Sequence, residues 1–292
     1  MINIQNLTKI YPTGVCANED ISICVNPGEI VGIVGVNGSG KTTLIRQLLK
    51  IIVPTKGKII VDDTEDYLGK LSYAPQFPAL YPSLTVRETI ILVLRYQQYK
   101  KKDAIKKSEE IVKQVGLERI ENQHTYTLSG GQQKLLSLAC ALASDKKYLI
   151  LDEPTSMVDI VTKEIIWSTL KKEKAKRGIL IASHDMGEIK RLCDRVIILK
   201  NGKVVYSGST ARVGEKCCII SLKIDKAIKE IDLILGPNCK YEIDEKLIKV
   251  VGKTISDVLI SIEKIKKVAD IESMSCEYPA FYEGVLDLVK NN

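Results

Sequence analysis

The fold is decided by one stretch of sequence, Gly35-Val36-Asn37-Gly38-Ser39-Gly40-Lys41-Thr42-Thr43. The apolar run Glu29–Val34 precedes it and predicts a buried strand, and Leu44–Leu49 follows it and predicts the opening of a helix. Strand, glycine-rich turn and helix in this order are the context that a phosphate-binding loop requires. A turn without function would also fit the pattern, but the flanking strand and helix favour phosphate binding.

The residue types of this stretch suit a polyphosphate. Glycines let successive backbone N–H groups turn inward and form a nest for an anion. The helix that begins near Lys41 directs its positive end at the same point. The Lys41 ammonium is suited to the β- and γ-phosphates, and the Thr42 hydroxyl is suited to Mg²⁺. The stretch therefore predicts a nucleoside triphosphate site.

The composition is that of an ordinary globular protein. The chain has 292 residues, enough for one large domain and a small one, with 45% hydrophobic and 27% charged residues. No apolar run approaches the roughly 18 residues of a membrane span. The first residues lack the basic start and apolar core of a signal peptide. We therefore expect a chain that stays in the cytoplasm.

The cysteines and the charge point to no further cofactor or nucleic acid. The eight cysteines show no CxxC spacing, so we expect reduced core residues and neither a metal site nor a disulfide framework. The net charge of +7 comes largely from lysines, including Lys100–Lys102 and the Lys106-Lys107 pair. No nucleic-acid motif or aromatic platform accompanies them, so a solvated face is expected, with some attraction to an anionic membrane surface.

The chain around the glycine-rich stretch alternates between predicted strands and helices. Short period-two or apolar runs predict strands at Ile2–Ile4, Ile21–Val25, Ile59–Val61 and Leu71–Tyr73. The last of these leads to a polar amide, Gln76. Residues 84–116 carry helical periodicity, so residues 77–127 are expected to form an all-helical insertion in an α/β protein.

A second glycine-rich segment and a pair of acids follow the insertion. Leu128-Ser129-Gly130-Gly131-Gln132 runs into an apolar helix, which predicts a second anion site at a helix N-terminus. The run Tyr148–Glu153 predicts a buried strand that ends in Asp152 and Glu153. Carboxylates at the carboxyl edge of a sheet beside a phosphate loop suit a metal-bound water and a general base. Asp152 alone could be structural, but the pair favours catalysis.

The roles of His184 and Tyr11 cannot be inferred from either residue alone. The run Ile179–Asp185 predicts another strand that ends on a polar tip, His184. A lone histidine is usually unremarkable, so His184 counts only with the acids. Tyr11 lies in a loop between two early strands, where its ring could stack on an adenine or simply fill the core or surface.

In this order the motifs resemble those of the ATP-binding cassette (ABC) ATPases, the motor subunits of ABC transporters, over about residues 1–210. The matching segments are the phosphate loop Gly35–Thr43, the Q-loop residue Gln76, the signature Leu128–Gln132, the Walker B strand Tyr148–Glu153, the D-loop Ser156–Asp159 and the switch histidine His184. Tyr11 falls where the family's adenine-stacking aromatic lies. The signature LSGGQ is the most specific of these, because other proteins with a phosphate loop lack it.

The resemblance implies the fold and the cofactors. It implies a P-loop NTPase with a mixed sheet over residues 1–208, a helical subdomain at about 77–145, and ATP and Mg²⁺ as cofactors. Two cassettes, identical copies or this chain and a sibling subunit, would pair head to tail, with each ATP between one phosphate loop and the signature of the other chain. That signature surface would be Ser129, Gly130, Gly131 and Gln132.

The resemblance also implies roles for single residues. Mg²⁺ would be held by Thr42, Asp152 and Gln76, and Asp159 would belong to the D-loop. Glu153 would polarise the attacking water, and His184 would contact the γ-phosphate and organise Glu153. The implied catalytic set is Lys41, Gln76, Glu153 and His184.

Three positions depart from the family pattern. Val36 replaces a common proline, and Lys134 and Cys140 stand where arginine is frequent. None of these changes removes a catalytic group. We therefore expect an active ATPase.

The last part of the sequence predicts a separate small domain. Ser207–Gly214 suits a linker, and residues 209–292 are expected to form an α/β appendage without a catalytic constellation. Its predicted elements are strands at 217–222 and 246–251 and helices at 255–264 and 279–289. Cassettes of bacterial drug, bacteriocin and sodium exporters end in a similar way. A dimer-stabilising cover is the favoured role over ligand sensing.

The leading functional hypothesis is the ATPase of an exporter, bound to the inner face of the membrane through a separate multi-span permease subunit. Ser83–Glu88, after Gln76, resembles the surface on which such subunits dock. The alternative is a soluble ABC ATPase with a partner such as a ribosome or DNA. The single signature, close to Lys41 in sequence, disfavours that reading. A non-hydrolysing regulatory cassette is opposed by the presence of Glu153 and His184.

Overall fold

The chain forms two compact units. The computed structural model describes residues 1–213, 218–226, 228, 231–235, 240–244, 246–252, 255–277 and 285. The first unit spans Met1–Ser207 and the second spans Gly208–Asn292, a boundary one residue before the one that the sequence predicts. None of the helices in the described residues is long and apolar enough to cross a membrane.

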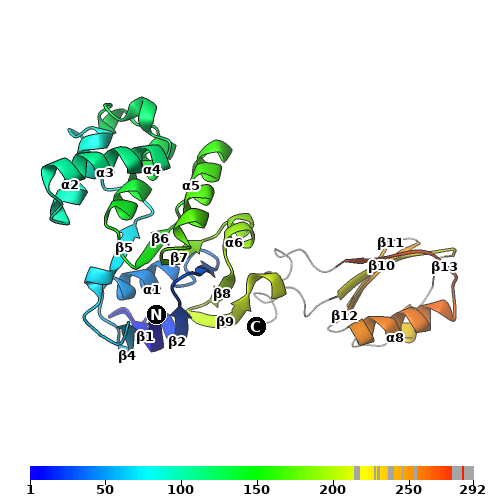
Figure 1. Cartoon of the computed structure of the whole chain (residues 1–292). Helices are drawn as coiled ribbons and strands as arrows, with labels where there is room; N and C mark the ends of the chain where they lie inside the picture. The colour runs from blue at the N-terminus through cyan, green and yellow to red at the C-terminus, as the bar shows by residue number, and fades with distance from the viewer. Residues whose placement is uncertain are drawn as a thin grey trace. The chain divides into compact units, whose positions relative to one another are not determined.

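A six-stranded sheet forms the centre of the first unit (Figure 1). In spatial order its strands are β5 (Leu71–Ala74), β6 (Tyr148–Asp152), β7 (Gly178–Ser183), β3 (Ile30–Val34), β8 (Arg195–Lys200) and β9 (Lys203–Ser209). The five strands from β5 to β8 pair in parallel. Every residue of β3, β6 and β7 is buried, as expected of central strands covered on both faces.

The register of this sheet gathers distant residues at one edge. Val34 pairs with Ser183, and Asp152 pairs with Ala182, so β3, β6 and β7 end side by side. The residues that follow these strands therefore come together, because parallel strands present their carboxyl ends at the same edge. This edge carries the glycine-rich loop, the acids and the histidine.

A second, antiparallel sheet packs over the first. It consists of β2 (Cys16–Val25), β1 (Ile2–Ile10) and β4 (Lys56–Val61) in that order. One hydrophobic core joins side chains of both sheets to α1 (Lys41–Leu48), which lies between them in Figure 1. On the other face of the large sheet, α6 (Met186–Leu192) lies so close to β3 that a Cβ at Gly32 would approach Ile189 to 2.7 Å.

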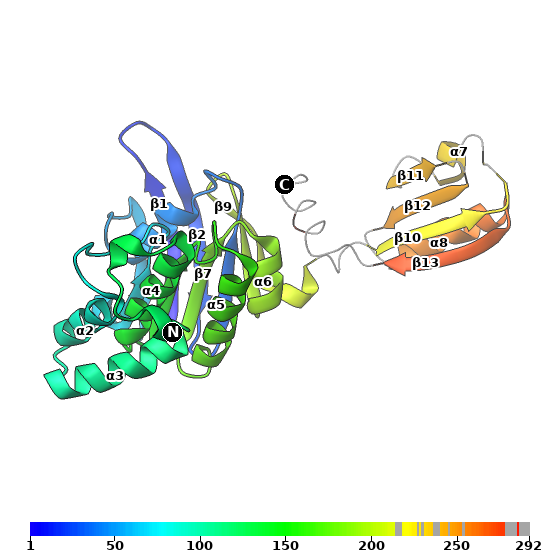
Figure 2. The ribbon, with the colours of Figure 1, turned by 90° about the horizontal axis from the view of Figure 1, so that it is seen from above.

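The helices of the predicted insertion pack on one another. They are α2 (Val86–Tyr96), α3 (Lys101–Gln114) and α4 (Gly130–Ala143), which lie together at one end of the unit in Figure 2. Thr85 caps α2 in a capping box with Glu88. The remaining helix of the unit is α5 (Ile160–Glu173), and short 3₁₀ turns occupy Leu68–Lys70, Glu118–Ile120, Thr125–Thr127 and Thr210–Arg212.

In the described residues of the second unit, a four-stranded antiparallel sheet is accompanied by two helices. Its elements in chain order are β10 (Cys218–Ile224), α7 (Ile231–Leu235), β11 (Lys240–Asp244), β12 (Leu247–Gly252), α8 (Ile255–Lys266) and β13 (Ile271–Glu277). The strand order is β11-β12-β10-β13, so β12 lies between the two strands that α7 connects. This is the ferredoxin-like split βαβ arrangement. Its own core gathers buried side chains from both helices and the sheet.

Sequence analysis predicted only some of the elements of this second unit. It predicted counterparts of β10, β12 and α8, but α7, β11 and β13 were not foreseen. The predicted helix at 279–289 lies outside the described residues, apart from Val285.

Candidate nucleotide site

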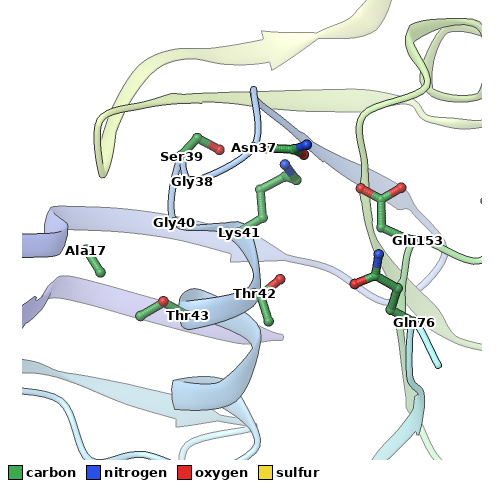
Figure 3. A pocket seen from close by; sticks show the side chains of 10 residues that line it. All are labelled: Ala17, Asn37, Gly38, Ser39, Gly40, Lys41, Thr42, Thr43, Gln76 and Glu153. Atoms are coloured by element: carbon green, nitrogen blue, oxygen red, sulfur yellow. The ribbon is translucent and has the colours of Figure 1, made fainter. Parts of the chain in front are cut away.

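One wall of a hollow is formed by the loop between β3 and α1 (Figure 3). The hollow has a volume of about 190 Å³, and Asn37–Thr43, which we call the phosphate wall, lines this side. Gly38 and Gly40 adopt φ of +81° and +106°. Glycine reaches this left-handed region without strain, which lets the loop turn its N–H groups inward. Because α1 begins at Lys41, its N-terminal end also faces the hollow.

Lys41 is buried and held by its own loop. Its Nζ donates to the carbonyl oxygens of Gly35 and Val36 at 2.7 and 3.3 Å. Burial lowers the pKa of Lys41, and the carboxylates of Glu153 and Asp152 oppose that shift. An ammonium in this position can exchange carbonyl partners for the stronger acceptors of a phosphate group.

A buried amide pair supports the phosphate wall from behind. Asn18 of β2 is fully buried and donates through Nδ2 to the carbonyl oxygen of Gly40 at 3.2 Å. Gln47 of α1 donates to Asn18 Oδ1 at 2.8 Å. These contacts fix the turn that precedes α1 to the neighbouring sheet.

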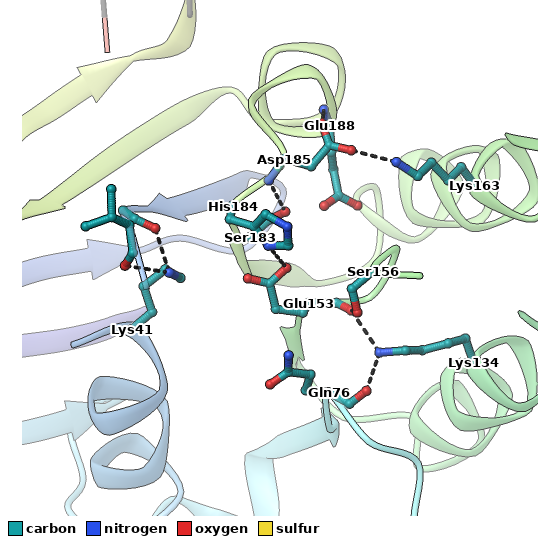
Figure 4. Close-up of polar contacts among 12 residues, drawn as sticks. Lys41, Gln76, Lys134, Glu153, Ser156, Lys163, Ser183, His184, Asp185 and Glu188 are labelled. Carbon is teal, nitrogen blue, oxygen red and sulfur yellow. Dashed lines mark hydrogen bonds and ion pairs between the residues drawn. The ribbon is translucent and has the colours of Figure 1, made fainter. Parts of the chain in front are cut away.

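The opposite wall comes from the ends of three strands. Gln76 follows β5, Asp152 ends β6, Glu153 comes next, and His184 follows β7; we call these four residues the carboxylate wall. Gln76 and Glu153 line the hollow across from Lys41 (Figure 3). His184 Nδ1 lies 2.7 Å from Glu153 Oε2 (Figure 4). The Glu153 side chain is only 8% exposed, whereas that of His184 is 59% exposed, so the histidine presents its other face outward.

Glu153 has an unusual backbone. Its φ is +50°, a left-handed conformation that is uncommon for a residue with a side chain. Its N–H donates to the Ala182 carbonyl at 2.8 Å, and its own carbonyl accepts from Ser156 Oγ at 3.0 Å. Such conformations cost about 1–3 kcal/mol and persist where surrounding contacts enforce them, often at functional sites.

Asp152 supplies an oxygen without a partner. The residue is 2% exposed, and no described residue hydrogen-bonds to its buried Oδ1. Burial, and next the charge of Glu153, raise the pKa of Asp152, while Lys41 lowers it. A buried carboxylate oxygen of this kind fits a cation, because unpaired buried polar atoms are costly.

The oxygen donors that the sequence predicts for a metal are of a type that fits Mg²⁺. No cluster of three or more histidines, cysteines and acids suited to a metal occurs in the part of the chain that the structure describes. The set predicted from sequence combines the Thr42 hydroxyl, the Gln76 amide and the Asp152 carboxylate, and Thr42 and Gln76 both line the hollow. Mg²⁺ prefers such hard oxygen ligands and keeps several waters, so few protein ligands suffice.

The structure adds a residue whose role the sequence did not suggest. Lys134, in the second turn of α4, donates to the carbonyl oxygens of Gln76 and Glu153, the latter at 2.9 Å (Figure 4). It is 9% exposed. Burial lowers its pKa, and the carboxylates of Glu153 and Asp152 oppose the shift. In the sequence, Lys134 was noted only because arginine is frequent at its position. No spacing rule relates Lys134 to Gln76 and Glu153, which lie 58 and 19 residues away.

The signature segment does not line the hollow of its own chain. Ser129 and Gln132 form a capping box at the start of α4, in which each side chain accepts a hydrogen bond from the backbone N–H of the other. The S-x-x-Q spacing contained this information. Gly131 lies beside Asp159, the N-cap of α5: a Cβ at Gly131 would approach Asp159 Oδ2 to 3.5 Å.

The remaining predicted residues have mixed positions. Tyr11 follows β1, and its hydroxyl lies 3.4 Å from Thr43 Oγ1, beside the phosphate wall. Ala17, which the sequence did not single out, lines the hollow. Cys16, Cys24, Cys140 and Cys193 are free thiols; Cys193 is buried as expected, whereas Cys16 is exposed. The prediction that the cysteines lie in the core is therefore wrong for Cys16.

Comparison with known proteins identifies the class. The ABC transporter family model matches residues 18–156. The carnitine transport ATP-binding protein OpuCA of Listeria monocytogenes serotype 1/2a (strain 10403S) is 32% identical over 217 residues, which cover 70% of this chain and 54% of that protein. The methionine import ATP-binding protein MetN of Bacillus subtilis (strain 168) is 36% identical over 228 residues, 73% of this chain and 67% of that protein.

Solved structures agree with these relatives. A dimeric ATP-binding cassette in a post-hydrolysis state, bound to ADP and Pi, matches with a TM-score of 0.66 and 29% identity over 72% of this chain and 98% of that one. An ATP-binding subunit of an ABC transporter matches with a TM-score of 0.67 and 26% identity over 73% of this chain and 91% of that one.

The chain therefore belongs to the ABC transporter family through its ATP-binding domain, and its P-loop fold is that of an ABC ATPase domain. It spans about half the length of the carnitine transport relative and about two thirds of the methionine import relative.

Proposed function

We propose that the chain is the ATP-hydrolysing motor of an ABC transporter and works as a pair of cassettes on separate membrane subunits. One observation carries the hydrolytic part. His184 Nδ1 contacts Glu153 Oε2 at 2.7 Å, and Glu153 lines the same hollow as Lys41. A base held by a histidine and opposed to a phosphate nest is the arrangement that attack by water on a γ-phosphate requires.

Each wall has its own part in the proposed reaction. The loop N–H groups and Lys41 hold the phosphates, and Glu153 accepts a proton from the attacking water. An ionised carboxylate only accepts hydrogen bonds, so Nδ1 of His184 carries the proton between them and orients Glu153. Gln76 and the Asp152 and Thr42 oxygens would hold Mg²⁺, which supplies positive charge for the phosphates when bound.

Glu153→Gln tests the hydrolytic proposal. Glutamine keeps the size of the side chain but cannot accept the proton, so the rate of ATP hydrolysis should fall by about 10²–10⁴-fold while ATP binding persists. Glu118→Gln, in a 3₁₀ turn of the insertion, is the matched control and should hydrolyse ATP like wild type. Wild-type turnover in Glu153→Gln would contradict the role of Glu153.

The paired state rests on the position of the signature segment. Ser129–Gln132 lie outside the hollow of their own chain, so a second chain is needed to bring them to the nucleotide. The structural relative described as dimeric supports this proposal. With ATP present, Glu153→Gln should accumulate as a dimer in light scattering. A monomer under saturating ATP would count against the paired state.

We propose that the membrane partner docks beside β5, α2 and α4. A hollow of about 470 Å³ is lined by residues of β5, α2 and α4, among them Tyr73, Val93 and Cys140. Phe77, which lies just after Gln76 and four residues after Tyr73, is 73% exposed. Because exposed apolar surface marks protein interfaces, we propose that Phe77 and the residues of this hollow contribute to docking. The peripheral position on the inner face of the membrane follows from this proposal.

An affinity pull-down from detergent-solubilised host membranes tests the partner. The wild-type chain should recover a multi-span membrane protein, and Phe77→Ser should recover less. Val53→Ser, which removes an apolar side chain that is 77% exposed, is the control and should recover as much as wild type. Recovery of ribosomal proteins alone would favour the soluble alternative.

Export is the finer prediction of the sequence, and the two named relatives do not support it: one is named for carnitine transport and the other for methionine import. Reconstituted vesicles with the cassettes outside distinguish the directions. Added ATP should drive cargo into the vesicles if the system exports. Release of preloaded cargo would instead identify an importer.

A further inference from the structure

Lys134 lies where two separate parts of the site meet. It belongs to α4, whose first residues form the signature, and its ammonium reaches the ends of β5 and β6. Helix α4 therefore carries the signature at one end and, one turn further, a direct link to the carboxylate wall. Ser129 and Lys134 are five positions apart, which is about 7.5 Å along the helix axis.

The two acceptors of Lys134 are the main-chain oxygens of residues whose side chains line the hollow. Both oxygens belong to peptide groups at the carboxyl edge of the sheet, that of Gln76 after β5 and that of Glu153 after β6. A bond to a main-chain carbonyl fixes the peptide plane, and the peptide plane sets the direction in which the side chain leaves. Lys134 thus acts on Gln76 and Glu153 without touching the nucleotide itself.

The backbone of Glu153 needs such support. Its left-handed φ of +50° is enforced by bonds on both sides of the residue, and Lys134 is one of the two side chains that bind its carbonyl. The other is Ser156, which lies three residues along the same turn. Of these two side chains, Lys134 is the one that comes from the insertion.

We propose that Lys134 is a positioning residue that couples the signature helix to the geometry of hydrolysis. This inference rests on the proposed ATPase function. When the N-terminal end of α4 engages a nucleotide, a shift of the helix is passed through one ammonium to the peptide groups of Gln76 and Glu153. ATP can bind to the phosphate wall without this link, but the carboxylate wall is aligned for attack only with it.

Steady-state kinetics of the full chain test the proposal, with Lys134→Met as the main variant. We expect kcat to fall about tenfold or more, while the affinity for ATP, measured by calorimetry, stays within about twofold of wild type. Lys134→Arg keeps a charged donor and should recover much of kcat. A loss of fold alone would not produce this division between kcat and binding, nor rescue by arginine.

A matched lysine serves as control. Lys107 of α3 is also partly buried in the insertion, but it binds Tyr99 and Asp145, away from the hollow. Lys107→Met should leave kcat at the wild-type value. If Lys134→Met fails to fold, Lys134→Gln replaces it, since a neutral shorter donor cannot span both carbonyls.

The outcomes separate the inference from the function on which it rests. A wild-type chain that hydrolyses ATP, together with a Lys134→Met or Lys134→Gln variant of equal kcat, would overturn the coupling role and leave the ATPase proposal standing. A wild-type chain without any ATP hydrolysis would instead overturn the proposed function. Equal losses in Lys107→Met and Lys134→Met would show a general packing effect and also overturn the coupling role.

Discussion

The phosphate wall and two members of the carboxylate wall, Gln76 and Glu153, line one hollow, but the two walls are built differently. The phosphate wall is a continuous run of residues in one turn, and it works largely through main-chain groups. The carboxylate wall takes its four members from the ends of three strands and works through side chains. A wall made of one turn depends on local conformation, whereas a wall made of strand ends depends on sheet register and on a distant support, Lys134.

The largest effect is expected from the one charged side chain of the phosphate wall. Lys41→Ala should weaken ATP binding by about 100-fold, because a charge-assisted contact to the phosphates is lost. Calorimetry with ATP is the measurement. Lys50→Ala, at an exposed position after the same helix, is the control and should bind as wild type does. Unchanged affinity in Lys41→Ala would mean that main-chain groups suffice.

The conformation of the turn should matter nearly as much. A Cβ at Gly40 would come within 2.3 Å of the Ala17 carbonyl oxygen, and φ is +106° there. Gly40→Ala should therefore displace the turn and weaken ATP binding roughly thirtyfold. Gly14 has φ of +83° but no atom within 4 Å of its Cβ position, so Gly14→Ala isolates the cost of the backbone conformation. If Gly14→Ala weakened ATP binding as much as Gly40→Ala, the close contact with the Ala17 carbonyl oxygen would not explain the loss.

Asp152 tests whether the carboxylate wall holds the metal. Asp152→Asn should reduce the part of ATP affinity that depends on Mg²⁺ by about tenfold, as judged by calorimetry with Mg²⁺ and with EDTA. Binding in EDTA should change little, because the phosphate wall is intact. Asp145→Asn, an exposed acid outside the hollow, is the control. If Mg²⁺ raises the ATP affinity of Asp152→Asn as much as that of wild type, Asp152 does not hold the metal.

Asp152→Asn also tests how the stability of the ligand-free chain depends on pH. Because burial and Glu153 raise the pKa of Asp152 above its ordinary 3.8, the favourable contribution of the protonated acid is complete below pH 3.8 and is lost as the pH rises through the raised value. The Tm of Asp152→Asn relative to wild type should therefore increase between pH 4 and pH 7. A constant difference over this range would contradict the raised pKa.

The smallest effect is expected behind the phosphate wall. Asn18→Leu leaves the Gly40 carbonyl and the Gln47 amide without their buried partner, so unfolding should become easier by about 1–2 kcal/mol. ATP affinity should change by less than about threefold. Thermal unfolding compared with Asn26→Leu, at an exposed position, measures the difference. A large loss of ATP binding would make the amide pair part of the site itself.

Prediction from sequence succeeded where the information is local. The strand, glycine turn and helix around Lys41 form one continuous pattern, and the fold of an ABC ATPase domain is confirmed. Glu153 was indicated by the pair of acids at the end of its predicted strand, whereas Gln76 and His184 could be given roles only through the family resemblance. The closeness of the three depends on the register of β5, β6 and β7, which the sequence does not state. Their catalytic roles stay predictions.

The sequence could not reveal contacts that involve main-chain oxygens. Lys134 donates to two main-chain carbonyl oxygens. Because every residue has a main-chain carbonyl, the residue types in the sequence do not identify these partners. Helix α5 was also missed, because apolar and polar residues alternate around it without a clear stripe. In the second unit, β11 and β13 are rich in polar residues and carry a weak strand signal.

Strand β5 is paired on one side only. It has four residues, its partner is β6, and within the described sheet no strand lies beyond it. Strand β3 is paired on both sides. Amide hydrogens of Leu71–Ala74 should therefore exchange with solvent sooner than those of Ile30–Val34. We therefore expect the strand that leads to Gln76 and the insertion to open more easily than the strand that leads to the phosphate loop.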